Sequence, residues 1–337
     1  MASTKSFPMA QIQERSLASV SFDELPLAES DPPYSAWGLW GKDDELGRTN
    51  LITPDITRKA AQTEIRTGQV VQLNLPLNVP IRPMNPARAK LSHRIIVKEH
   101  SNDDEIIINT QSSTHWDGPR HYPYREGRRF YNGCTQSDVT GPNKNNRLGI
   151  QNLAERPLAS RGVLLDWADY AASKNKTYDA FDSFEIPYTE LQEIADMRGI
   201  KFQQGDILFV RSGYGLQYNA LDEPAKDKLG LRKGSGRKYM GVAGSVESAR
   251  WHWQAGFAAV AGDSNTYESW PAVIGGDRIR LHEVFLNGWG MPIGEQFDLE
   301  QLSRRCKELG RWTFFVTSQP LNLPAGIASP ANVMAIF

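Results

Sequence analysis

The chain has 337 residues, of which 40% are hydrophobic and 23% charged, a composition typical of a compact globular protein and not of a disordered one. It carries 38 lysines and arginines against 39 acidic residues, so its net charge is -1 and it has no overall basic field to hold a nucleic acid. Its two cysteines are too few for a disulfide framework, a cysteine-rich zinc site or an iron–sulfur cluster.

The first residues of the chain are polar and show no sustained periodicity. They lack the apolar segment of a secretory signal, and no run of 18 or more apolar residues occurs anywhere in the sequence. We therefore expect a cytoplasmic protein with no membrane partner. Residues 1–36, which include the turn signal DPP at 31–33, are expected to form an N-terminal arm, and residues 37–337 a single domain.

The first predicted helix follows Thr53, a residue type that favours the N-cap position. Pro54 suits the first helical position, and Gly68 is a stop signal. Alternating apolar and polar residues then predict a strand over 70–77. Further strands are expected at 93–98, 105–110, 162–166, 206–211, 257–261 and 312–317, and further helices from 189, 245 and 298. This alternation predicts an α/β or α+β fold, with a long loop over 212–240.

The segment 111–121 reads QSSTHWDGPRH and follows an apolar strand-like stretch. In an extended chain His115 and Asp117 project to the same face, and a turn through Gly118 and Pro119 would return His121 to it. Imidazole and carboxylate groups suit zinc, manganese or iron, so the three residues predict a metal site. A chance HxD and a core histidine are the alternative. Trp116 is expected to stack on a flat substrate, although tryptophan more often lies in a core.

A second segment, near the C-terminus, supplies His282 and, thirteen residues later, Glu295. A cation site usually draws ligands from distant parts of the chain, so both are candidates. The alternative is a surface histidine and a glutamate at a helix start. Other chemistries have no motif here: there is no GxSxG elbow, no GxGxxG after a strand and no phosphate-binding GxxxxGK[ST] loop.

These residues resemble the cyclase family of metal-dependent hydrolases, which includes kynurenine formamidase and isatin hydrolase. The family signature is HxGTHxDxPxH, and His115, Asp117, Pro119 and His121 match it. Similar segments occur at 40–55, 205–213, around LHEVFLNGWGMPIGE and at the C-terminus. The resemblance thus covers most of the chain from Trp37 onward.

The resemblance implies a single-domain swivelling β/β/α fold, with a mixed sheet flanked by helices, in a homodimer or homotetramer that binds zinc or manganese. It implies that His115 and Asp117 are metal ligands. It also implies that His121, His282 and Glu295 complete a second metal position or act as acid and base. Gln111 stands where the family has its first histidine, and its neutral carbonyl oxygen is a weaker ligand, so we expect about one metal ion per chain.

The sequence thus predicts a hydrolase that cleaves an amide, formamide, cyclic amide, ester or lactone bond of a small, aromatic molecule. A bound cation would lower the pKa of a water molecule and polarise the scissile carbonyl. His121 is the expected general base and Glu295 the group that passes the proton to the leaving nitrogen. Two alternatives stay open: a metal-dependent cyclase or dehydratase, and a non-catalytic protein that binds a small molecule.

Overall fold

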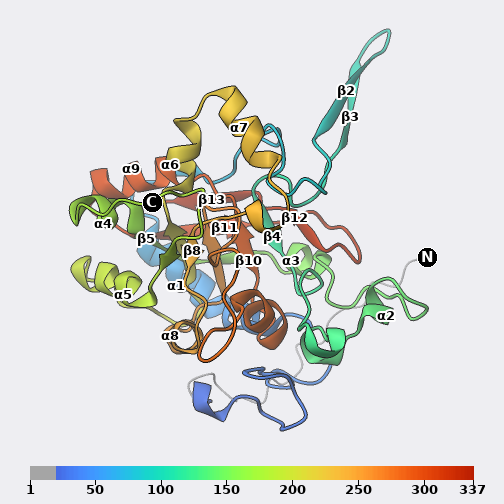
Figure 1. Ribbon diagram of the computed structural model, residues 1–337, viewed down its shortest axis with the longest axis vertical. Coiled ribbons are helices and arrows are strands. Elements are labelled where there is room, and N and C mark those ends of the chain that lie inside the picture. The colour runs from blue at the N-terminus through green and yellow to red at the C-terminus, as the bar shows by residue number, and fades with distance from the viewer. Residues whose placement is uncertain (1–19) are drawn as a thin grey trace.

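The computed structural model describes residues 20–337, which form one domain around a large curled sheet (Figure 1). The folded part of the described chain begins earlier than the predicted boundary at Trp37. Phe22 is buried, and its ring stacks on Tyr34 and meets Trp289 edge-on. Residues 20–36 are therefore packed on the body, whereas the rest of the predicted arm, 1–19, lies outside the described residues.

The main sheet has nine strands within residues 20–337. Its centre is parallel, from β5 to β10, and its two sides are antiparallel. In spatial order the strands are β1 (Val70–Gln72), β13 (Val333–Ile336), β11 (Thr313–Ser318), β5 (Leu158–Asp166), β7 (Ile207–Arg211), β9 (Ala259–Gly262), β10 (Ile293–Glu295), β4 (His115–Asp117) and β12 (Ala328–Pro330). Two small sheets pair β2 (Ser92–Val97) with β3 (Asn102–Ile107) and β6 (Glu185–Ile186) with β8 (Gly241–Val242).

Both faces of the sheet are buried, each under its own hydrophobic core. Successive residues of a strand point to opposite faces and so enter different cores. Val163 and Leu165 of β5 pack into one core, and Leu164 packs into the other. Helices flank the sheet (Figure 1). The α-helices of residues 20–337 are α1 (Pro54–Glu64), α2 (Gln136–Val139), α3 (Gln151–Glu155), α4 (Trp167–Ser173), α5 (Tyr188–Met197), α6 (Tyr214–Asn219), α7 (Glu223–Gly230), α8 (Val246–Ala255) and α9 (Glu300–Leu309), and not all of them lie against the sheet.

These elements confirm the predicted α/β fold, a mixed sheet flanked by helices in a single domain. The start of α1 is the one predicted: the hydroxyl of Thr53 accepts a hydrogen bond from the Ile56 backbone N–H at 3.3 Å, and Pro54 is the first helical residue. Among residues 20–337 no helix is both long and apolar enough to cross a membrane.

Two segments differ from the predictions. The strand expected at 105–110 does not lead directly into the 111–121 motif, because β3 ends at Ile107 in a hairpin with β2 that projects from the body (Figure 1). Its apolar side chains, including Val97 and Ile107, are exposed. The long loop expected over 212–240 contains two helices, α6 and α7. Short helices with few apolar positions give little periodicity for a sequence reading to detect.

Gly294 of β10 allows the sheet to pack closely beside the 111–121 motif. A Cβ atom there would lie 2.6 Å from the Phe297 ring, 2.7 Å from the Ala261 Cβ and 2.9 Å from the Trp116 ring. We expect Gly294→Ala to lower the free energy of unfolding by about 1–3 kcal/mol through overpacking, measured by thermal and urea unfolding. Gly236→Ala is the control, since its Cβ would meet nothing within 4 Å. Equal stability of the two variants would contradict this packing.

Candidate functional site

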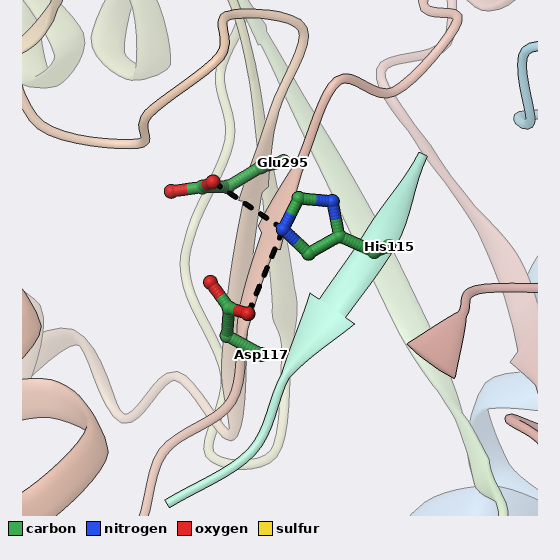
Figure 2. Close-up of side chains that lie close together, drawn as sticks. All are labelled: His115, Asp117 and Glu295. Atoms are coloured by element: carbon green, nitrogen blue, oxygen red, sulfur yellow. Dashed lines mark ion pairs between the residues drawn. The ribbon is translucent and has the colours of Figure 1, made fainter. Parts of the chain in front are cut away.

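The site is built on β4, which lies between β10 and β12 and is antiparallel to both. His115 stands directly opposite Glu295 in the ladder, and Asp117 lies two residues along the same strand. Because residues two apart share a face, all three side chains point into one buried space (Figure 2). One ligand atom from each of the three lies within 4.8 Å of the others. The structure thus brings together His115, Asp117 and Glu295 from two distant segments.

The orientation of the His115 ring leaves a lone pair facing two carboxylates. Its Nδ1 lies 2.8 Å from the backbone carbonyl oxygen of Ser113, which can only accept, so Nδ1 carries the hydrogen. Nε2 then faces Glu295 Oε2 at 3.4 Å and Asp117 Oδ1 at 3.6 Å, and has no hydrogen-bond partner among residues 20–337. A buried lone pair between two anions requires a cation, either a proton or a metal ion.

The electrostatics of the three residues agree with that requirement. Burial lowers the pKa of His115, but the charges of Asp117 and Glu295 outweigh burial and raise the pKa to about 9. Burial raises the pKa of Asp117, but the charges of His121 and His115 hold it well below its usual range. Asp117 Oδ2 is buried and has no hydrogen-bond partner in the part of the chain that the structure describes. The donor set, one imidazole nitrogen and carboxylate oxygens, fits a divalent metal cation.

Gln111 and His121 both lie next to Asp117. The Gln111 side-chain nitrogen donates to Asp117 Oδ1 at 2.7 Å and lies 3.1 Å from His121 Nδ1. In this orientation Gln111 acts as a hydrogen-bond donor, a different role from the metal ligand considered above. His121 Nε2 is 3.6 Å from Asp117 Oδ2, and its side chain is 21% exposed, so it is the histidine of the motif with access to solvent.

His282 lies next to Glu295. It is held there by Glu268, a residue that the sequence analysis did not identify. Its Nε2 is 3.1 Å from Glu295 Oε1, and its Nδ1 is 2.8 Å from Glu268 Oε1. Glu268 is buried and also accepts hydrogen bonds from the backbone N–H groups of Leu281 and His282, where the helical segment Glu283–Gly288 begins. No motif marks Glu268 in the sequence; its only signal is that it follows the buried strand β9.

Trp116 does not face the site, so the prediction that it stacks on a substrate is wrong. It lies between His115 and Asp117 in β4, so strand alternation turns it to the opposite face. The side chain is fully buried, its ring packs edge-on against Phe297, and its indole N–H donates to the Ser318 hydroxyl at 2.9 Å. Trp116 is therefore a core residue that supports the strand carrying the site.

Comparisons with known proteins agree with this fold. The family model described as "Putative cyclase" matches residues 71–269, which include the 111–121 motif but not His282 or Glu295. A crystal structure described as a novel cyclase is 28% identical with a TM-score of 0.78, and the match covers 90% of this chain and 99% of that one.

Two isatin hydrolase structures share the fold at lower identity. Isatin hydrolase A from Labrenzia aggregata, bound to benzyl benzoate, is 16% identical with a TM-score of 0.55, over 79% of this chain and 93% of that one. Isatin hydrolase A from Ralstonia solanacearum is 16% identical with a TM-score of 0.55, over 84% and 96%. No curated protein matches the chain. The family match spans more than half of the sequence, and this protein is a member of the cyclase family.

Proposed function

We propose that this protein is a metal-dependent hydrolase of small molecules, which cleaves an amide, formamide or cyclic amide bond. The observation that carries the proposal is the unpartnered Nε2 of His115, buried between Asp117 and Glu295. Two structures named isatin hydrolase share the fold, which supports the choice of a hydrolase. A cation held by these three residues would polarise a carbonyl oxygen and lower the pKa of a water molecule.

The other residues of the site have roles that follow from their positions. His121, partly exposed beside Asp117, accepts the proton of the attacking water. Burial lowers the pKa of His121 below its ordinary value of 6.5, so the ring is neutral and able to accept a proton at pH 7. Glu268 fixes the ring of His282 from the far side, and the His282–Glu295 pair delivers a proton to the leaving nitrogen. Gln111 holds Asp117 by its amide N–H.

The test combines metal analysis with a substrate screen. Elemental mass spectrometry of the purified protein, before and after chelator, is expected to give about one divalent ion per chain. Formanilides, lactams and cyclic imides are then incubated with the metal-loaded protein, and products are identified by mass. A product equal to substrate plus one water supports a hydrolase. A product equal to the substrate, or to the substrate minus water, indicates instead a cyclase or dehydratase, and protein that binds no divalent ion and turns nothing over contradicts the proposal.

A further inference from the structure

Arg88 lies beside the site and has no acidic partner in the part of the chain that the structure describes. Its Nη1 donates to the backbone carbonyl oxygen of Gln111 at 2.6 Å, and the side chain of Gln111 in turn binds Asp117 at 2.7 Å. The side chain of Arg88 is half-buried, and within residues 20–337 no carboxylate lies within 4.0 Å of it. By contrast, Arg82 on the same segment pairs with Asp227 at 2.8 Å. Among these residues Arg88 thus differs from Arg82 in having no carboxylate paired with its guanidinium group.

The charge of Arg88 reaches the residues of the site. After burial and the nearer histidines, Arg88 contributes to the low pKa of Asp117, and it also lowers the pKa of His121. A divalent cation would neutralise the two carboxylates of Asp117 and Glu295. In the metal-bound site that the proposed function requires, the positive charge of Arg88 therefore has no counterion within reach.

A second segment adds positive charge on the same side. Tyr239 donates from its hydroxyl to the Met84 carbonyl oxygen at 2.6 Å, which joins residues 232–240 to the segment that carries Arg88. Burial raises the pKa of Tyr239 to about 12. The charges of Arg237, Arg88 and Arg232 oppose that rise, and the charge of Glu295 adds to it.

The geometry of Arg88 favours a carboxylate as the missing partner. Among residues 20–337 Nη1 is the one nitrogen of Arg88 that donates a hydrogen bond, to the Gln111 carbonyl oxygen, and Nε and Nη2 have no partner there. Two parallel N–H groups on that edge match the two oxygens of a carboxylate. We propose that the substrate carries a carboxylate beside its scissile bond, and that Arg88 binds this carboxylate and thereby selects acidic substrates. The inference rests on the proposed hydrolase and names the class of molecule that it accepts.

The test compares two substrates that differ only in the carboxylate, N-formylanthranilate and formanilide. The wild-type protein is expected to prefer the first, and Arg88→Gln to lose about 10- to 100-fold of that preference in kcat/KM, chiefly through KM. Turnover of formanilide should fall much less than turnover of N-formylanthranilate, and metal content should stay close to that of the wild-type protein. Arg88→Lys is expected to restore part of the preference. Lys90→Gln is the control, because Lys90 lies on the same segment and faces Asp227 at 3.9 Å.

An equal loss of rate on both substrates in Arg88→Gln would show a structural role and overturn the inference, as would an unchanged preference. If the wild-type protein hydrolyses neither compound, the proposed hydrolase activity fails for these two substrates. The role of Arg88 is then tested by measuring the affinity of the protein for each compound. Calorimetric titration is then expected to show tighter binding of N-formylanthranilate than of formanilide, lost in Arg88→Gln. Equal affinity for both compounds, or binding of neither, overturns the inference.

Discussion

Asp117→Ala is expected to purify without its divalent ion and to have no hydrolytic activity above background. Asp117 supplies a buried carboxylate within 4.8 Å of the ligand atoms of His115 and Glu295, and its free Oδ2 faces His121. Loss of a charged ligand should cost more than the roughly 10- to 100-fold in metal affinity that follows the loss of a supporting residue. Elemental mass spectrometry measures the loss of metal, and turnover of a substrate identified in the screen measures the loss of activity.

Asp104→Ala is the matched control for Asp117→Ala. Asp104 is an exposed carboxylate on the hairpin, paired with His93 at 2.9 Å, and its removal should change neither metal content nor rate. Circular dichroism checks that Asp117→Ala is folded, and Asp117→Asn keeps the shape of the side chain if it is not. Full metal content in a folded Asp117 variant would mean that the ligands have been assigned wrongly.

His121→Ala is expected to keep most of its metal and to lose about 10²- to 10⁴-fold in kcat, the usual contribution of a general base. The pH dependence gives a second measurement. Burial lowers the pKa of His121, and a base must be unprotonated to act. The wild-type rate should therefore fall as the pH drops below about 6.5 through that lowered pKa, and stay level around neutrality.

In His121→Ala this acid limb should be absent, because the group that titrates has been removed. His93→Ala serves as the control, since His93 is exposed on the hairpin and pairs only with Asp104 among the described residues. An unchanged acid limb in His121→Ala would assign the base to another group. Loss of all metal in His121→Ala would make His121 a ligand rather than a base.

Strong local signals made much of the fold predictable. Thr53 and Pro54 mark the start of α1, and the apolar runs of β5, β7 and β11 were predicted within a few residues, because capping and buried strands depend on adjacent residues. The projecting hairpin was read as ordinary strands, since its isoleucines and valines have the same propensity whether exposed or buried.

The candidate site was predictable where it depends on strand alternation and not where it depends on tertiary contact. The pair His115 and Asp117 follows from a period of two, and the same period places Trp116 in the core and not at the site. Glu268 and Arg88 reach the site through loops whose paths only the folded chain defines. No spacing in the sequence relates either residue to the 111–121 motif.

The three-residue strand β4 also restricts how this protein can change over evolution. β10 and β12 hold it in one register on both sides. A single inserted or deleted residue that shifted the register would exchange the two faces, placing the indole of Trp116 among the acidic groups and the imidazole of His115 against Phe297. Substitution of a residue in this motif is therefore tolerated more readily than a change in the length of the motif.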